Sequence, residues 1–486
     1  MTKPFLTFIL FSFCCIPSIA QESFKKPNII FFLVDDLGWT DTEPYGSKFY
    51  ETPNIKKLAQ EGMLFTQAYA ANPVCSPTRA SILSGKYPSS IQATNWFGAP
   101  QPDEELANLK TKATNPLLSA AYQEHLPLKE ITLAEALKKG GYKTFFAGKW
   151  HLGETEEFWP EHQGFDINKG GYSSGSPKSY FSPYKNPRLS DGPIGEHLPD
   201  RLATETNQFI EAHAKGPFFA VLSFYSVHNP LAGRKDLVEK YEAKRKTLGL
   251  DDEFGLEGKF KVRTNQSHAT YAAVIEGMDL AVGKVLQKLK ELNLEDNTII
   301  VFFSDNGGLA INEGTPTSNL PLRAGKGWLY EGGIREPLIM KWPQVIKAGS
   351  KTQTPVISND FYATFLAAAK LPLMPKQHTG STNLLPLLKG EDLKERALFW
   401  HYPHYSNQGG SPGSAIRKGD WKLIIWYESG KEELFNLKHD IGEQNNLLSK
   451  KPKIAKSLGK ELSKWLKKEK ALFPEKNPAY VKDKVN

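Results

Sequence analysis

The sequence has 486 residues, of which 40% are hydrophobic, 12% aromatic and 23% charged, and it carries a formal net charge of +8. At roughly 100 to 200 residues per domain this length accommodates two to four structural units, and the composition excludes a disordered chain or a coiled coil. No apolar run reaches the roughly 18 residues of a membrane-spanning helix, which argues against an integral membrane protein.

The first twenty residues have the pattern of a secretory signal peptide. Lys3 precedes an apolar run over 5–16, and small residues at both ends of 18–20 form a cleavage pattern. We therefore predict a cleaved signal over 1–20 and a secreted or periplasmic mature protein. Two of the three cysteines leave with this signal, so that Cys75 is the one that remains and no internal disulfide can form.

Several apolar, β-rich runs alternate with helical patterns along the chain. The expected strands lie at 28–34, 144–147, 218–224 and 298–303, with helices at 132–139 and 271–292. Alternation of this kind is typical of a mostly parallel α/β sheet, and near-continuous apolarity in the first and last strands indicates that helices cover both faces. We predict a large, mixed, mostly parallel sheet sandwiched by helices.

Polar residues follow each of the expected strands at once. They are Asp35-Asp36, Gly148-Lys149-Trp150-His151, His228-Asn229 and Asp305-Asn306. Ligands of open α/β sheets bind beyond the carboxyl ends of the strands. The sequence therefore predicts one site to which all four clusters contribute.

The segment from Cys75 to Gly85 predicts a helix that begins at the cysteine. Pro77 suits the first turn of a helix and Gly85 its end. Free backbone N–H groups at such an end favour an anion, and Arg79 adds a cation one turn later.

The pattern changes after residue 373. Segments 421–427 and 433–437 flank a Ser429-Gly430 turn and predict an antiparallel hairpin.

The end of the chain is basic. Residues 449–486 hold twelve lysines and four acidic residues, so their net charge equals that of the whole chain. Apolar residues recur in this segment at helical spacing. We predict a smaller α+β subdomain over 374–486 with a basic terminal helix. A solvated lysine face is favoured over a polyanion-binding one, and no motif supports nucleic-acid binding.

The motif Cys75-x-Pro77-x-Arg79 resembles the maturation signature of the type I sulfatases of the alkaline-phosphatase-like superfamily. Further similar segments lie at 27–36, 148–153, 164–166, 227–230, 304–307, 325–327 and 332–335, so that the resemblance covers nearly the whole mature chain. It implies a catalytic domain over 21–373. It also implies that a formylglycine-generating enzyme oxidises Cys75 to formylglycine (3-oxoalanine).

The same resemblance implies a Ca²⁺ site. Its ligands would be Asp35, Asp36, Asp305, Asn306 and an oxygen of the modified Cys75. Calcium takes six to eight oxygen ligands, mainly carboxylates and carbonyls, and this residue set agrees with that preference.

The resemblance further implies catalytic roles for six residues: Cys75, Arg79, Lys149, His151, His228 and Lys326. One hydroxyl of the hydrated aldehyde would attack sulfur, and loss of the proton from the other would expel sulfate. Arg79 would steady this diol, both lysines would bind sulfate oxygens, and His151 would be the base. His228, with Lys326, would serve the leaving alcohol. Arg335 is as well suited to bracing the site as to touching sulfate, and we leave it out of the catalytic set.

Substrate choice is expected in loops around the pocket. The segments 95–124, with Trp96, and 401–410, with His401 and His404, offer aromatic faces and sugar-bonding side chains. A secreted sulfatase with a basic tail suggests that the substrate is a sulfated polysaccharide. Galactose- or galactosamine-containing glycans are the first choice, and ulvan-type uronic or rhamnose units are the second.

Two other functions remain open from the sequence. A formylglycine-dependent phosphonate or phosphodiester hydrolase would use the same groups, and a silent homologue could bind glycans without turnover. The sequence leaves undecided the sulfated position, endo or exo action and the oligomeric state.

Overall fold

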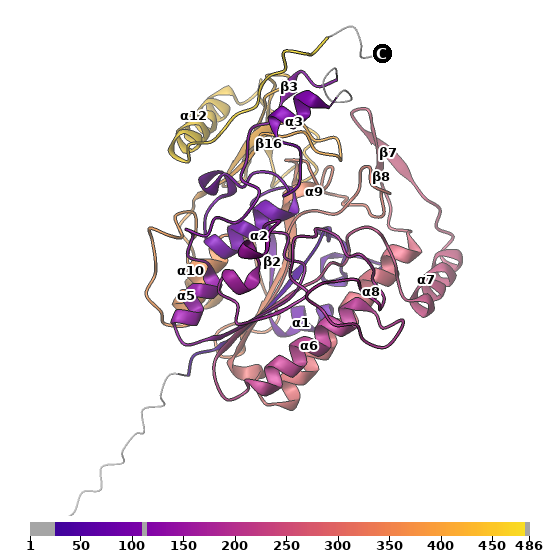
Figure 1. The fold of residues 1–486 in the computed structure, drawn as a ribbon. Helices are drawn as coiled ribbons and strands as arrows, with labels where there is room; N and C mark the ends of the chain where they lie inside the picture. The colour runs from indigo at the N-terminus through magenta and orange to yellow at the C-terminus, as the bar shows by residue number, and fades with distance from the viewer. Residues whose placement is uncertain (1–24, 109–113, 482–486) are drawn as a thin grey trace, which may run out of the picture.

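The computed structural model describes residues 25–108 and 114–481, so the signal peptide predicted over 1–20 lies outside the described residues. A sheet runs through the middle of the molecule with helices packed on both sides (Figure 1). Nine strands form it, eight of them in the order β11-β2-β10-β9-β1-β6-β4-β5, while β12 pairs with β2. The predicted fold class is confirmed.

The centre of the sheet is parallel, and its strands are apolar except near their ends. It consists of β1 (Asn28–Val34), β4 (Lys143–Gly148), β6 (Phe218–Ser223) and β9 (Thr298–Ser304). Strand β1 lies between β6 and β9, and β4 pairs with β6. The carboxyl ends of these four strands consequently meet at one edge, as the sequence pattern predicted.

The sequence analysis predicted a mixed sheet but did not locate its antiparallel strands. Strand β10 (Arg335–Lys341) runs antiparallel to β9 and to β2 (Met63–Tyr69). The remaining strands of this sheet are β5 (Ile167–Lys169), β11 (Ser350–Thr352) and β12 (Val356–Ile357).

Helices cover both faces and enclose two apolar cores. One face packs against α1 (Pro53–Glu61), α6 (Leu198–Ala212) and α8 (Ala269–Glu291), and α7 (Lys235–Thr247) lies outside α8. The other packs against α2 (Cys75–Ser84), α5 (Leu133–Lys139) and α10 (Asp360–Ala368). Burial on both sides explains why the central strands lack polar alternation.

A second sheet forms the C-terminal subdomain. Its antiparallel order is β13 (Ala397–Tyr402), β14 (Gly413–Lys418), β15 (Trp421–Trp426) and β16 (Glu432–Asn436). The predicted hairpin corresponds to β15 and β16. Helix α12 (Pro452–Lys468) packs on this sheet through Leu462 and Trp465 (Figure 1, yellow). The domain boundary at 373/374 stays a prediction.

Shorter elements complete the fold: α3 (Pro102–Ala107), β3 (Leu117–Leu118), β7 (Phe254–Glu257), β8 (Phe260–Arg263), α9 (Glu331–Ile334), α11 (Leu385–Leu388) and β17 (Glu475–Lys476). Within 25–108 and 114–481, none of the helices combines the length and apolarity needed to cross a bilayer.

A buried charge cluster joins the two sheets. Lys422 Nζ lies 2.9 Å from Glu331 Oε1 and 2.9 Å from Glu443 Oε1, and all three side chains are buried. Glu443 Oε2 also accepts a hydrogen bond of 2.6 Å from the backbone N–H of Glu331. Because Glu331 begins α9, five residues after Lys326, this cluster anchors the subdomain next to a candidate site residue.

Candidate active site

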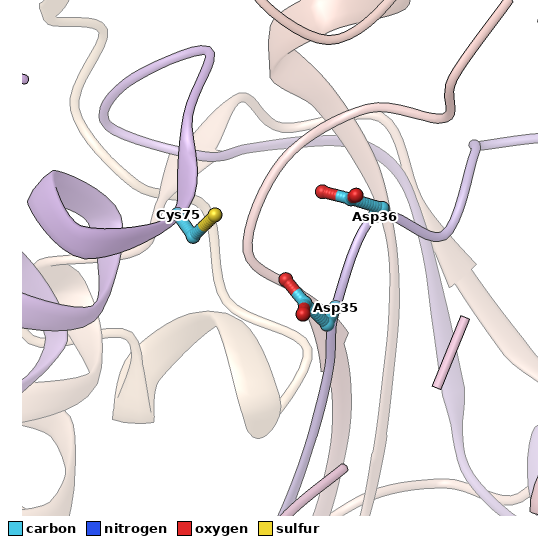
Figure 2. A group of neighbouring side chains, drawn as sticks. All are labelled: Asp35, Asp36 and Cys75. Carbon is cyan, nitrogen blue, oxygen red and sulfur yellow. The ribbon is translucent and has the colours of Figure 1, made fainter. Parts of the chain in front are cut away.

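The carboxyl edge of the sheet brings the strand-end residues together. Asp35 and Asp36 follow β1, Lys149 follows β4, and Asp305 and Asn306 follow β9. Cys75 opens α2, with the backbone of Val74 extended before it and the αL residue Gly85 after it. Figure 2 shows its side chain beside both aspartates, and single ligand atoms of Asp35, Asp36 and Cys75 lie within 4.8 Å of one another.

Three short ion pairs hold these acidic groups, and a fourth, of 3.6 Å, joins Arg79 Nη2 to Asp35 Oδ1. Lys149 Nζ lies 2.7 Å from Asp35 Oδ2, Lys326 Nζ lies 2.8 Å from Asp36 Oδ2, and Arg79 Nε lies 2.7 Å from Asp305 Oδ2. All six side chains are buried. The protein's own charges therefore balance in this cluster, with three carboxylates against three cations.

The acidic cluster fits a hard cation. The Oδ1 atoms of Asp35 and Asn306 are buried and accept no hydrogen bond from the described residues, while Asn306 Nδ2 donates to Asp36 Oδ1 at 2.8 Å. The amide is thus oriented with its oxygen free. Buried oxygens without hydrogen-bond partners are costly. Carboxylate and amide oxygens are ligands that Ca²⁺ prefers, so a bound Ca²⁺ ion would satisfy them.

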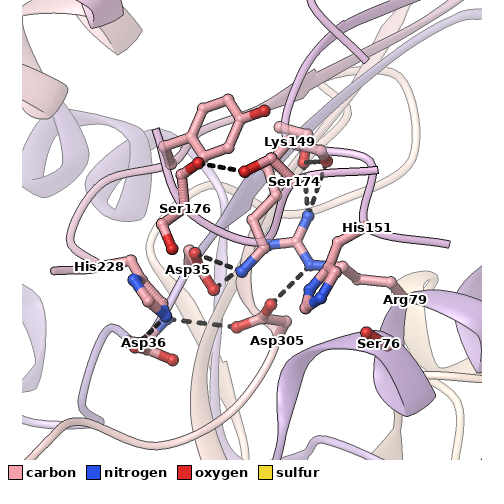
Figure 3. A network of polar contacts seen from close by, with 12 residues as sticks. Asp35, Asp36, Ser76, Arg79, Lys149, His151, Ser174, Ser176, His228 and Asp305 are labelled. Carbon is pink, nitrogen blue, oxygen red and sulfur yellow. Dashed lines mark hydrogen bonds and ion pairs between the residues drawn. The ribbon is translucent and has the colours of Figure 1, made fainter. Parts of the chain in front are cut away.

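Arg79 fixes the geometry of the site from α2. Besides Asp305, its guanidinium donates hydrogen bonds to Lys149 O at 2.9 Å and to Ser223 Oγ at 2.7 Å. Figure 3 shows Arg79 between the aspartates that follow β1 and β9. One arginine therefore joins the ends of β1, β4, β6 and β9.

The two histidines expose different nitrogens. His151 Nε2 lies 3.0 Å from Phe97 O and must donate, which leaves the buried Nδ1 free to accept a proton. His228 Nδ1 lies 2.7 Å from Asn229 O, so that Nε2 faces Asp36 Oδ2 at 3.7 Å. Burial holds the pKa of His151 well below its ordinary value and lowers that of His228 to about 4, and nearby lysines act in the same direction. Both rings are neutral at pH 7.

The thiol and the lysine respond to burial in opposite ways. Burial raises the pKa of Cys75 to about 11, although Lys149 and Lys326 oppose it, so the unmodified side chain is not a thiolate at neutral pH. Burial alone would lower the pKa of Lys326, but Asp36 and the other anionic groups near it, Asp35 among them, together outweigh burial and hold the pKa well above the ordinary value. Lys326 therefore stays protonated.

A cavity of about 540 Å³ opens above this cluster. Its lining includes Cys75, His151, His228 and Lys326 at the base and Trp96 at the side. We name it the ester cavity, because its base holds the candidate nucleophile beside fixed cations and a base.

Comparison with known proteins agrees with this geometry. The model of the sulfatase family matches residues 27–371, well over half of the chain. The chain belongs to the sulfatase family. It is a sulfuric ester hydrolase of the type I, alkaline-phosphatase-like group, and the family model for the C-terminal part of N-sulphoglucosamine sulphohydrolase matches 324–471.

Individual relatives align with most of the length of this sulfatase. It is 32% identical to a sulfatase of Formosa agariphila, over 96% of this chain and 95% of that protein. It is 31% identical to the N-acetylgalactosamine-6-sulfatase of Canis lupus familiaris, over 85% of this chain and 74% of that protein. The crystal structure of Ps i-CgsB in complex with k-i-k-neocarrahexaose is 28% identical, with a TM-score of 0.74 and coverage of 91% and 93%.

The ester cavity also has walls that the sequence analysis missed. They are Glu154, the segment from Tyr172 to Ser176, Lys178 and Glu313. Gly175 lies against the imidazole of His151, since a Cβ there would lie 2.6 Å from Cε1. The Ser- and Gly-rich run 173–176 was the available signal, but it looks like an ordinary loop.

Two predicted substrate residues do not line the ester cavity. His401 belongs to β13, and its ring nitrogens lie 2.7 Å from Ser414 Oγ and 2.8 Å from Leu472 O. His404 is fully buried, with Nε2 2.9 Å from Thr94 Oγ1. Their assignment to substrate binding is therefore corrected: both histidines hold the loop, and Asn407 and Gln408 of the same loop reach the cavity. Trp96 does line it.

Arg335 braces the fold. Its guanidinium donates two hydrogen bonds to Thr66 O, at 2.8 and 2.6 Å, and lies 3.3 Å from Glu331 Oε2. It is not among the residues that line the ester cavity.

We expect Gly410→Ala to lower kcat/KM about 10- to 100-fold, because a shift of about 1 Å in an active site can have that effect. A Cβ at this position would lie 1.8 Å from Gly327 O, so that the backbone beside Lys326 or beside Gln408 has to move. The measurement is hydrolysis of 4-nitrophenyl sulfate, with Gly216→Ala as control because a Cβ at that position meets no atom within 4 Å. Parental activity in the Gly410 variant would show that this contact is unimportant.

Proposed function

We propose that this enzyme removes sulfate from a sulfated polysaccharide or oligosaccharide, using formylglycine derived from Cys75 and a Ca²⁺ ion. The observation that carries the proposal is the buried cluster of Asp35, Asp36, Asp305 and Asn306 beside Cys75 at the base of the ester cavity. Secretion or export to the periplasm, following cleavage of residues 1–20, and maturation by a formylglycine-generating enzyme are parts of the same proposal.

The charges of the cluster favour an anionic substrate once the site is complete. Three carboxylates and three cations cancel within the protein. A bound Ca²⁺ ion would add two positive charges, orient sulfate oxygens and stabilise the charge that develops on them. Asp35, Asp36, Asp305 and Asn306 are the residues that would hold it.

The thiol itself is a poor catalyst here, because its pKa of about 11 keeps it protonated. Oxidation of Cys75 to formylglycine supplies an aldehyde whose hydrate offers a hydroxyl nucleophile and a route to sulfate release. The position of Cys75 at the start of α2 places that nucleophile against free backbone N–H groups.

The remaining residues bind and move protons. Arg79 and Lys149 keep the carboxylates in place, and the protonated Lys326 donates to a sulfate oxygen or to the leaving oxygen. The free Nδ1 of His151 accepts a proton from the hydroxyl of residue 75. The proton for the leaving alcohol comes from the protonated Lys326. His228 lies beside the same Asp36 carboxylate, and because its neutral ring carries the proton on Nδ1, its Nε2 can accept a hydrogen bond there.

The names of the relatives support a sulfated galactose or N-acetylgalactosamine residue as substrate. One relative is an N-acetylgalactosamine-6-sulfatase, and one structural neighbour was crystallised with neocarrahexaose. The half-buried Trp96 offers an aromatic face for a sugar ring at the wall of the ester cavity. We accordingly place galactose-containing glycans first among sulfated substrates.

Peptide mass spectrometry of protein from its natural secretion route tests the maturation of Cys75. We expect the peptide that bears it to lose about 18 Da, whereas ordinary thiol oxidation adds oxygen. Protein modified in this way should release sulfate from galactose-type sulfated glycans, and a chelator should abolish the release and lower the melting midpoint. A thiol mass in active protein, or faster hydrolysis of phosphate than of sulfate esters of one leaving group, would overturn the proposal.

A further inference from the structure

Helix α12 and the segment that follows it border a cavity of about 440 Å³ on the outside of the C-terminal subdomain (Figure 1, yellow). We name it the basic groove. Its lining comes from Ile425 and Tyr427 at the end of β15, from α12, and from Phe473 beyond the helix. It shares no lining residue with the ester cavity. A ligand in the basic groove therefore does not occupy the candidate active site.

The aromatic side of the basic groove is held in place by specific contacts. His401 Nε2 donates a hydrogen bond of 2.8 Å to Leu472 O, which fixes the backbone just before Phe473. The ring of Phe473 then packs edge-on against Tyr427 and His401, with ring centroids 5.4 and 5.3 Å apart. Phe473 nevertheless remains 48% exposed. An aromatic surface is thus fixed beside the groove and stays open to a ligand.

Lysines line up along the face of α12 that borders the basic groove. Positions 456, 460, 463 and 467 follow one another at intervals of four, three and four residues, which places them on one face of the helix. Three of them are lysines, and Ser463 and Lys467 line the groove. Lys470, just after the helix, lines it too. We name Lys456, Lys460, Lys467 and Lys470 the lysine stripe, and all four are exposed.

The lysine stripe has no counter-charge of its own. Within residues 25–108 and 114–481 none of its four lysines forms an ion pair with a carboxylate. The two glutamates of segment 452–470 have other cations: Glu461 lies 2.9 Å from Lys418, and Glu469 lies 3.4 Å from Lys468. Like charges four residues apart destabilise a helix, and a solvated surface is most favourable when both signs of charge are interspersed. The stripe therefore indicates an anionic ligand.

The combination of aromatic rings and ammonium groups fits a sulfated sugar. Tyr427 and Phe473 offer large apolar contact in a defined orientation, while Lys467 and Lys470 would pair with sulfate. The volume of about 440 Å³ is within the range of ligand sites. A concave groove receives a ligand, whereas binding to a lipid surface needs an apolar face that enters the bilayer. The sequence favoured a solvated lysine face because the groove beside the lysines is formed by residues distant in the chain.

We infer that the basic groove binds a sulfated stretch of the polysaccharide outside the ester cavity. Sulfate groups pair with the lysine stripe, and a sugar ring packs against Phe473. A long chain held in this way stays at high effective concentration near the ester cavity, which a small substrate does not. This inference rests on the proposed function for the identity of the polymer, while its binding test does not require turnover.

Calorimetric titration with a sulfated galactan tests the inference, in the Cys75→Ala protein so that the polymer is not hydrolysed. We expect the double variant Lys467→Gln with Lys470→Gln to weaken binding about threefold to tenfold, as loss of two exposed ion pairs does. Phe473→Ala should weaken it about fivefold or more, the usual effect of removing an aromatic contact. Binding that is unchanged in Phe473→Ala would overturn the inference.

The matched control for the lysine variant is Lys246→Gln with Lys290→Gln. Both residues are exposed, lie near the ends of α7 and α8, and line neither the basic groove nor the ester cavity. The change in net charge is the same in the two double variants. Equal weakening by the control pair would show that the polymer responds only to the overall charge, which contradicts the inference.

Two further probes identify the class of ligand. Chemically desulfated galactan should bind at least about threefold more weakly than the sulfated form, since it cannot pair with the lysine stripe. Vesicles of phosphatidylglycerol should bind equally well to the Phe473→Ala protein and to its parent. Equal affinity for the two galactans would refute recognition of sulfate. Vesicle binding that is lost in the groove variants would assign the groove to a lipid surface instead.

Kinetics of the enzyme with Cys75 intact separate this inference from the proposed function. We expect both groove variants to raise KM for the sulfated galactan about threefold or more, with unchanged kcat/KM for 4-nitrophenyl sulfate, because the basic groove and the ester cavity share no residue. If the parent hydrolyses neither compound, the proposed function fails while the binding result stands. If KM for the galactan is the same in the parent and both variants, the basic groove does not hold the substrate.

Discussion

Cys75→Ala is expected to reduce sulfate release by at least about 10⁴-fold, since removal of a nucleophile has effects of this size. In the proposed mechanism the side chain of residue 75 is the source of the nucleophile, and no neighbouring group can replace it. The side chain is buried and small, so alanine leaves little empty space and the fold should persist. The measurement is kcat/KM for 4-nitrophenyl sulfate and for a sulfated galactan.

Two controls accompany this variant. Cys75→Ser has nearly the same size and carries one hydroxyl, but it lacks the second oxygen of a hydrated aldehyde, and we expect it to be inactive as well. The melting midpoint of both variants should remain close to that of the parent. Retention of more than about 1% of the parental rate by Cys75→Ala would remove this residue from the mechanism.

Lys422→Met should lower the free energy of unfolding by about 3 to 5 kcal/mol, the usual cost of breaking a buried ion pair. The substitution leaves Glu331 and Glu443 buried without their shared cation. Burial raises the pKa of Glu443 to about 7, and Lys422 is the main group that opposes this rise. Loss of Lys422 therefore removes most of what stabilises the charged form of this carboxyl. Denaturant unfolding measures the change.

The control for this variant is Lys418→Met on the neighbouring strand β14. Lys418 pairs with Glu461 at the surface, and exposed pairs of this kind contribute little. The double variant Lys422→Met with Glu443→Gln should recover part of the lost stability, because it removes a buried carboxylate that has lost its cation, whereas Glu331 keeps Arg335. Equal stability of Lys422→Met and Lys418→Met would show that the cluster does not anchor the subdomain.

The sequence identified the elements whose burial pattern is simple. Strands β1 and β9 are buried along their whole length and apolar in their interior, because helices cover both of their faces, and their positions could be read from composition alone. The polar pairs that follow them could also be found, since parallel strands end at one edge of the sheet. The start of α2 at Cys75 followed from Pro77 and Gly85.

Only the tertiary structure decided how the substrate loops are arranged. The sequence indicated His401 and His404 as sugar ligands, yet β13 and the packing against Thr94 bury both rings. Strand β10 could not be placed either, because its antiparallel partners lie far from it along the chain.

The local pattern of a sequence determines which segments form strands and helices and which residue types follow them. It does not determine which side of a loop faces a cavity, since that depends on close contacts between distant backbones such as Gly327 and Gly410. The sulfatase family and the candidate catalytic residues could therefore be predicted from the sequence. The walls of the ester cavity depend on long-range packing, which one-dimensional patterns do not record.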